Sequence, residues 1–204
     1  MSEPAPLVCV VDDDAMVRKS LLRLFKAEGL EAEGFESAQD YLDRALPAGP
    51  SCLVLDVHMP ELSGLDLQQV LADGGRDEQI VFITGQGDIP MCARAMRAGA
   101  TDFLPKPFSD MELLTAVRRA LERSRTRLRN HAEQAVARAR IATLSPREHQ
   151  VFERVITGMM NKEIAADFGT SIKTVKIQRA KLMAKMGVVS VAELVNLAQV
   201  AQRQ

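Results

Sequence analysis

Five polar side chains stand where short strand-like runs of the chain end, and their types suit phosphoryl chemistry. Carboxylates gathered in one partly desolvated pocket repel one another and need a compensating cation. Mg²⁺ prefers hard oxygen ligands and usually takes one or two protein carboxylates, while a lysine and a hydroxyl can hold phosphoryl oxygens. The set therefore predicts transfer of a phosphoryl group to a carboxylate. Its members are Asp12 and Asp13 after residues 7–11, Asp56 after 52–55, Thr84 after 80–83, and Lys106 just beyond 101–104.

A parallel sheet is needed to bring these residues together, and the pattern of the first 108 residues predicts one. Continuous apolar runs of the buried parallel type are separated by helical patterns that begin at capping residues. Five such units make a doubly wound α/β fold, in which the carboxyl ends of the strands converge on one crevice. A lone Asp at a strand end is more often a turn or cap residue, so the signal is the order of the whole set. The runs lie at 7–11, 31–35, 52–55, 80–83 and 101–104, and the caps are Asp14, Ser37 and Asp88. The second helical pattern, behind Ser37, includes Tyr41, Leu42 and Leu46.

One long helix is predicted after the sheet. Ser109 and Glu112 have the spacing of a capping box, and no Gly or Pro follows until Pro146. Apolar density falls beyond Leu121, where several arginines appear. We expect a helix that starts on the first domain and continues, exposed, as a linker; a partly frayed linker is the alternative.

The last sixty residues predict a separate all-α module of four helices. Ser145-Pro-Arg-Glu148 combines an N-cap, a proline in the first turn and a capping-box glutamate. Gly158, Gly169 and Gly187 end the first three helices, and Ser190 caps the fourth. The expected domains are an α/β domain at 1–122, a helical linker at 123–140 and the four-helix module at 141–204.

The third helix of this module has a face suited to nucleic acid. At about 100° per residue, one stripe is largely apolar and the opposing stripe is basic with short apolar members. Such a face can enter the major groove of DNA, where lysine can contact guanine and small apolar groups can contact thymine methyls. The face consists of Lys173, Lys176, Ile177, Ala180 and Ala184, bordered by possible phosphate contacts at Thr170, Ser171, Thr174, Arg179 and Lys181.

Charge and composition narrow the class of protein. Residues 1–122 hold 11 Lys and Arg against 21 Asp and Glu, a net charge of −10; residues 123–204 hold 15 against 6, a net charge of +9. The basic half is a candidate for binding a polyanion. No apolar run approaches the length of a membrane span, the first residues lack the features of a secretory signal, and Cys9, Cys52 and Cys92 lack ligand spacing. We expect a cytoplasmic protein with reduced cysteines that does not associate with a membrane.

The first 122 residues closely resemble the receiver domain of two-component response regulators. The resemblance rests on Val10-Val-Asp-Asp-Asp14, Leu55-Asp-Val-His-Met-Pro60, Thr84-Gly85 and Lys106-Pro107. It implies that Asp56 accepts a phosphoryl group from a sensor histidine kinase and that Mg²⁺ is held by Asp12, Asp13, Asp56 and the backbone carbonyl of His58. It also implies that Lys106 pairs with the phosphoryl oxygens, that Thr84 moves toward them, and that Phe103 is the switch aromatic. Such domains commonly hold a cis peptide at Lys106–Pro107. The His58 side chain either tunes the lifetime of the phosphoryl group or is a solvated loop residue.

The C-terminal module resembles the helix-turn-helix output domain of the LuxR/FixJ type. The matching segments are Leu144-Ser-Pro-Arg-Glu148, Asn161-Lys-Glu-Ile-Ala165, Thr174-Val-Lys176 and Lys185-Met186; Thr84-Gly-Gln-Gly-Asp88 and Lys106-Pro-Phe108 look most like the FixJ branch. The resemblance implies a bacterial transcription regulator that is not an enzyme beyond its own phosphoryl transfer and slow dephosphorylation. It places Lys176, Ile177 and Ala180 toward the bases. It further implies homodimerisation on phosphorylation through residues 90–98, Phe103 and Leu104, promoter binding, and contact with RNA polymerase. Gln178 and Lys181 depart from the usual pattern and leave the target sequence open.

Two functions of other classes are alternatives to this one. A phosphoaspartate hydrolase also uses Asp, Thr, Lys and Mg²⁺, but its nucleophile normally follows the first strand, whereas Asp56 follows the third. A regulator that acts through protein contacts with a vestigial helix-turn-helix is the stronger alternative. The basic face of the third helix argues against it.

Overall fold

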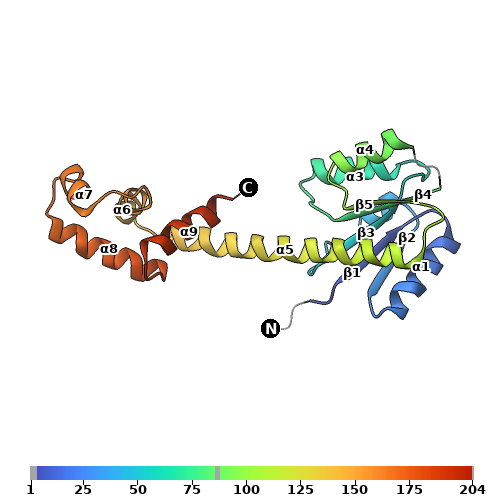
Figure 1. Ribbon diagram of the computed structural model, residues 1–204, viewed down its shortest axis with the longest axis horizontal. Helices are drawn as coiled ribbons and strands as arrows, with labels where there is room; N and C mark the ends of the chain where they lie inside the picture. The colour runs from blue at the N-terminus through green and yellow to red at the C-terminus, as the bar shows by residue number, and fades with distance from the viewer. Residues whose placement is uncertain (1–3, 86–87, 204) are drawn as a thin grey trace. The chain divides into compact units, whose positions relative to one another are not determined.

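The computed structural model describes residues 4–85 and 88–203, which form two compact units, Met1–Leu128 and Arg129–Gln204. The boundary lies within one continuous helix, α5 (Asp110–Ala142), which contributes to both units (Figure 1). The frayed alternative for the linker is therefore not observed. No single helix in the described ranges is long and apolar enough to cross a membrane; α8 (Ile172–Met186) and α9 (Val191–Gln202) pass that test only as a pair bent by 54°.

The first unit is a five-stranded parallel sheet in the order β2-β1-β3-β4-β5. The predicted doubly wound fold is confirmed, and the strands at 7–11 and 31–35 match their predicted bounds. The strands are β1 (Leu7–Val11), β2 (Glu31–Phe35), β3 (Ser51–Asp56), β4 (Ile80–Thr84) and β5 (Asp102–Pro105). The helices between them are α1 (Ala15–Ala27), α2 (Ala38–Leu42), α3 (Gly64–Asp73) and α4 (Ile89–Arg97).

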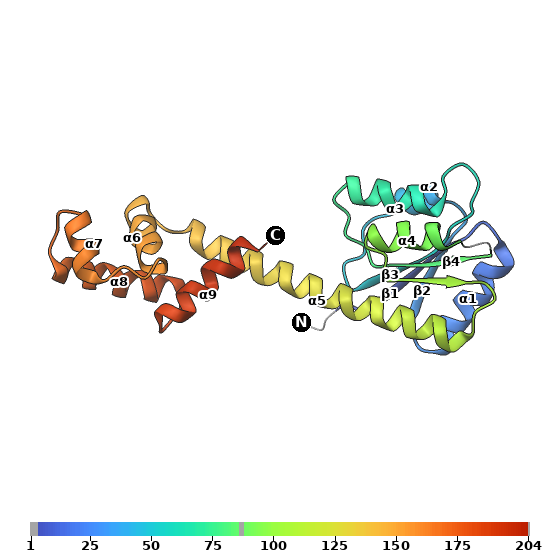
Figure 2. The ribbon, with the colours of Figure 1, turned by 45° about the horizontal axis from the view of Figure 1, so that its top comes forward.

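Helices cover both faces of this sheet (Figures 1 and 2). On one face, Val8, Val10, Val54 and Ile83 pack against α1 and the first turns of α5. On the other, alternate strand residues pack against α2, α3 and α4. Strands buried on both faces explain why they read as continuous apolar runs rather than alternating ones.

The second helix of the first unit is shorter than predicted. The Ser37 side chain accepts a hydrogen bond from the Asp40 amide, as an N-cap should, but α2 stops at Leu42. Leu46, which the pattern included, is 64% exposed. Pro47 accounts for part of the difference, because a proline disfavours helical backbone at the residue before it.

Two of the three cysteines are core residues. Cys9 and Cys52 are buried in β1 and β3, and Cys92 on α4 is half-buried. Burial raises the pKa of the Cys9 thiol to about 12 and also raises that of Cys52, which keeps both thiols protonated and unreactive.

The second unit consists of the end of α5 and four helices: α6 (Pro146–Ile156), α7 (Asn161–Asp167), α8 (Ile172–Met186) and α9 (Val191–Gln202). The capping box of α6 forms as predicted between Ser145 and Glu148. Buried side chains from α6, α7, α8 and α9 share one core.

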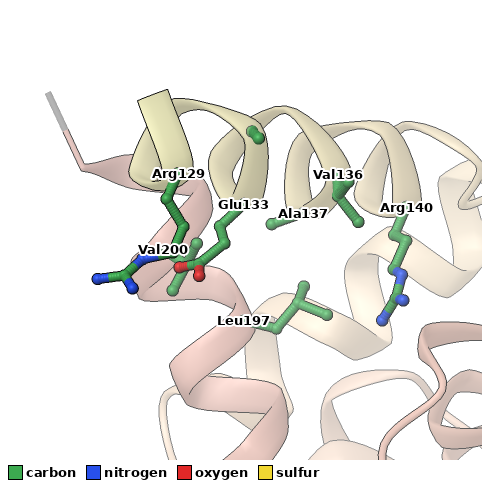
Figure 3. Close-up of a pocket in the computed structure, with 8 residues that line it drawn as sticks. Arg129, Glu133, Val136, Ala137, Arg140, Leu197 and Val200 are labelled. Atoms are coloured by element: carbon green, nitrogen blue, oxygen red, sulfur yellow. The ribbon is translucent and has the colours of Figure 1, made fainter. Parts of the chain in front are cut away.

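The last turns of α5 pack on α9, so they are not exposed throughout as the sequence suggested. Ala137 is buried against Leu197 and Ala201, and Arg138 Nε donates to the Ala201 carbonyl at 2.8 Å. A groove of about 410 Å³ lies between the two helices, with Val136 and Leu197 among its lining residues (Figure 3). The second unit thus begins at Arg129, before the expected boundary at residue 141.

Candidate functional site

The strand ends bring four of the predicted residues into one pocket. Lys106 Nζ lies 2.9 Å from Asp12 Oδ2 and 2.9 Å from Asp56 Oδ1, and its backbone N–H donates to the Thr84 carbonyl at 2.6 Å. Asp12, Asp56 and Thr84 are 1%, 5% and 0% exposed. Because β1, β3, β4 and β5 run parallel and are neighbours in this order, with β2 outside them, their carboxyl ends lie along one edge of the sheet.

Each buried carboxylate is held at both oxygens. The second oxygen of Asp56, Oδ2, accepts a hydrogen bond from the His58 backbone N–H at 2.8 Å, and Asp12 Oδ1 accepts one from the Asp14 backbone N–H at 2.8 Å. The two carboxylates therefore have fixed orientations, with one oxygen of each directed to Lys106. A fixed carboxylate oxygen is what a nucleophile in phosphoryl transfer requires.

The charges of the pocket are coupled. Burial raises the pKa of Asp56, and the nearby Asp12 charge adds to this, while the hydrogen bond from Lys106 acts in the opposite direction. Burial disfavours the charged form of Lys106, but its hydrogen bonds to Asp12 and Asp56 raise its pKa overall. Two buried carboxylates thus share one lysine, which leaves a net negative charge that a further cation could neutralise.

A glycine that the sequence analysis did not single out supports the acceptor. Gly64, the first residue of α3, lies so close to β3 that a Cβ on it would be 2.2 Å from the backbone oxygen of Asp56. Its N–H donates to the Val57 carbonyl at 3.0 Å. The only sequence signal was a glycine ahead of a helical pattern, which does not reveal a close approach of two backbones.

The two predicted switch residues, Thr84 and Phe103, have different neighbours. Thr84 Oγ1 lies 3.2 Å from His58 Nδ1. Phe103 on β5 is half-buried, with its ring centroid 6.1 Å from that of Phe82. The Lys106–Pro107 peptide is cis, as the resemblance implied. Gln86 and Gly87 of the quoted Thr84–Asp88 motif lie outside the described residues.

The predicted metal ligands are only partly assembled. Asp12 and Asp56 face the same lysine, whereas Asp13 is exposed, and the described residues contain no group of three His, Cys, Asp or Glu side chains able to hold a metal ion. The Lys106 ammonium bridges the two buried carboxylates. The oxygen donors and the excess negative charge still suit Mg²⁺, which takes few protein carboxylates.

In the second unit, α8 has the predicted division of faces. Val175, Leu182 and Met186 are fully buried, and Ile177 is 50% exposed. The exposed residues also include Lys173, Thr174, Lys176, Ala180 and Lys181. A basic, solvated face on a helix packed by its opposite side is the arrangement that a recognition helix needs.

Three residues at the border of this face form hydrogen bonds within the protein. Arg179 is half-buried and donates to Asn161 Oδ1 at 2.7 Å, which links α8 to α7. The Thr174 amide donates to Ser171 Oγ at 3.1 Å, and the two hydroxyls are 2.9 Å apart, so this pair caps α8. These side chains, for which the sequence suggests phosphate contacts, therefore also have structural roles.

Comparison with known proteins identifies the family. A model of the response regulator receiver domain matches residues 8–118, and a model of bacterial regulatory proteins of the luxR family matches residues 142–198. The chain belongs to the response regulators with a LuxR-type output domain. The regulator is thus a two-domain transcription factor of the two-component type, and the predicted family, fold and general function are confirmed.

Full-length relatives support the same assignment. The regulator is 49% identical over 95% of its length to nodulation protein W of Bradyrhizobium diazoefficiens, covering 85% of that protein. It is 43% identical over 98% of its length to the transcriptional regulatory protein FixJ of Azorhizobium caulinodans, covering 95% of it. Among solved structures, the response regulator StyR matches with a TM-score of 0.85 at 42% identity, covering 96% of this chain and 99% of StyR. Full-length FixJ from B. japonicum matches with a TM-score of 0.59 at 38% identity, covering 98% of each chain.

Proposed function

We propose that Asp56 accepts a phosphoryl group from a phosphohistidine of a sensor histidine kinase, and that this modification controls binding of α8 to promoter DNA. The observation that carries the proposal is the buried Asp12–Lys106–Asp56 arrangement at the strand ends. A buried acidic pair that shares a single lysine is costly for stability, and ionisable groups in such environments cluster at functional sites.

The transfer is a displacement at phosphorus. An Asp56 oxygen forms a bond to phosphorus, and the bond between phosphorus and the donor imidazole nitrogen breaks, which returns the histidine of the kinase. The product carries about two negative charges in place of one. Lys106, already 2.9 Å from Asp56 Oδ1, is near enough to pair with an oxygen of the incoming group.

Mg²⁺ bound by Asp12, Asp13, Asp56 and the His58 carbonyl would shield the carboxylates from the approaching phosphoryl oxygens. The proposed role of Lys106 requires it to exchange a carboxylate for a phosphoryl oxygen. Its side chain is 27% exposed, more than those of the aspartates, and has the freedom for that exchange. The regulator itself would act on no other substrate; its chemistry is limited to its own phosphorylation and dephosphorylation.

Phosphorylation of Asp56 would change the conformations of Thr84 and Phe103. Thr84 would move toward the phosphoryl group, and the half-buried Phe103 would repack against the sheet. Thr84 ends β4, and Phe103 on β5 packs on the same core cluster as Ala95 of α4. Met96, the next residue of α4, is 43% exposed. A change in this surface would favour a homodimer through α4 and β5, which pairs two recognition helices on related half-sites.

On DNA, α8 would enter the major groove. We assign Lys173, Lys176, Ile177 and Ala180 to base edges, because all four are exposed. Lys181, also exposed, would hold phosphates, with Thr174 and the free edge of the Arg179 guanidinium. RNA polymerase would be the further partner, in the cytoplasm of a bacterium.

Phosphorylation of the intact protein tests the proposal. With Mg²⁺ and a small phosphoryl donor such as phosphoramidate, we expect wild type to gain the mass of one phosphoryl group on Asp56. Asp40→Asn, an exposed carboxylate in the first turn of α2, is the matched control and should label like wild type. Labelling of Asp56→Asn at the wild-type level would refute the assignment.

A further inference from the structure

His58 connects the acceptor and the switch threonine. Its backbone N–H donates to Asp56 Oδ2 at 2.8 Å, while its ring Nδ1 lies 3.2 Å from Thr84 Oγ1. Thr84 is fully buried at the end of β4, whereas His58 is exposed on the loop after β3. The main chain of one residue thus touches the acceptor, and its side chain touches the hydroxyl that the phosphoryl group is expected to attract.

We propose that His58 is a positioning residue that restrains the Thr84 hydroxyl in the unphosphorylated protein and thereby opposes the active state. The inference rests on the proposed function, because it assigns to His58 a role in the switch that Thr84 performs. It concerns the side chain of His58 and is independent of the metal-binding role proposed for its carbonyl.

The restraint follows from the chemistry of a hydroxyl. Threonine has one O–H to donate and one oxygen to accept with, and a neutral imidazole has one donor and one acceptor nitrogen. If Thr84 donates to Nδ1, this hydrogen bond must break before the hydroxyl can donate to a phosphoryl oxygen. If Nδ1 donates instead, the contact still breaks when Thr84 moves. The His58 contact therefore favours the resting position in both tautomers.

The position of His58 in the chain allows it to restrain Thr84 without a large movement of its own. The residue lies two positions past Asp56, and its backbone is fixed by the hydrogen bond to Asp56 Oδ2. Its ring therefore has a fixed starting point beside the acceptor. A partly buried hydrogen bond of this kind is expected to change the ratio of resting to active states by about 2- to 10-fold.

Full-length variants test the restraint with beryllofluoride, a phosphoryl mimic, in the presence of saturating Mg²⁺. The dissociation constant for beryllofluoride is measured by calorimetry. His58→Leu removes the ring nitrogens and should bind the mimic about 2- to 10-fold more tightly than wild type. His58→Gln keeps polar atoms near Thr84 and should stay closer to wild type. His131→Leu, at an exposed histidine of the second unit, is the matched control and should be unchanged.

A double-mutant cycle separates restraint of Thr84 from other effects of His58. In a Thr84→Ala background, His58→Leu should no longer tighten binding, because the hydroxyl is absent. A second measurement needs no ligand: NMR couplings of Thr84 in Mg²⁺-free protein should report a different distribution of side-chain rotamers in His58→Leu than in wild type.

The outcomes distinguish the two proposals. Wild type that fails to bind beryllofluoride would overturn the phosphoacceptor function itself. If wild type binds beryllofluoride, two results would overturn the restraint alone. One is that His58→Leu binds beryllofluoride with the same affinity as wild type. The other is that His58→Leu tightens binding equally in the wild-type and Thr84→Ala backgrounds. A changed Thr84 rotamer distribution together with tighter binding would support it.

Discussion

Replacing Gly64 with alanine tests whether the close approach of α3 to β3 positions the acceptor. The new Cβ would lie 2.2 Å from the backbone oxygen of Asp56. Ordinary contacts between carbon and oxygen are about 3.3 Å or longer, so α3 or the end of β3 must move by about 1 Å. Overpacking of this kind costs about 1–3 kcal/mol of stability. Helix propensity alone predicts the opposite sign, a gain of up to about 1 kcal/mol, because alanine is the better helix former.

Urea denaturation of the full chain decides between the two signs. Gly85→Ala is the matched control, since a Cβ on Gly85 meets no atom of the described residues within 4 Å and should leave the free energy of unfolding nearly unchanged. The displacement should also slow phosphorylation of Asp56, by about 100-fold if the shift falls on the acceptor. A Gly64→Ala protein that is as stable as the Gly85→Ala control and is phosphorylated at the wild-type rate would show that the positioning argument is mistaken.

Three further perturbations have defined outcomes. Asp56→Asn should abolish phosphorylation while leaving the fold intact by circular dichroism; retained labelling would contradict this. Lys176→Ala should weaken specific DNA binding by roughly 1–3 kcal/mol if Lys176 reads a base, and an unchanged sequence preference would instead make it a phosphate contact. Hydrogen bonds from Lys185 and from the Ser145 backbone lower the pKa of Glu148 from 4.5 to about 2. This stabilisation is present above pH 4.5 and is lost as the pH falls toward 2. The melting temperature of the second unit should therefore fall less steeply with decreasing pH in Glu148→Gln than in wild type. Melting temperatures with the same pH dependence in both proteins would exclude the effect.

The sequence predicted the fold because its signals were local and mutually consistent. Continuous apolar runs identified β1, β3 and β4, and capping residues such as Asp14 and Ser145 identified where helices begin. The strand-end residues then followed from parallel topology, which is why Asp12, Asp56, Thr84 and Lys106 were expected together.

What the sequence did not reveal depends on contacts between distant segments. The approach of Gly64 to Asp56, the contact of His58 with Thr84 and the hydrogen bond of Arg179 to Asn161 arise only after folding. The packing of Ala137 on α9 was missed for the same reason, since an alanine in an arginine-rich helix gives little hydrophobic signal. The end of α2 was overextended because Leu46 fits a helical spacing but has no surface to pack on.

Selection of DNA from a random pool, with and without beryllofluoride and Mg²⁺, tests the central claim most directly. Phosphorylation-gated binding predicts that the full-length regulator enriches a repeated half-site much more strongly with the mimic, and that Asp56→Asn does so in neither condition. Equal enrichment by wild type in both conditions, or enrichment in neither, would contradict the proposal that chemistry at Asp56 controls the recognition helix.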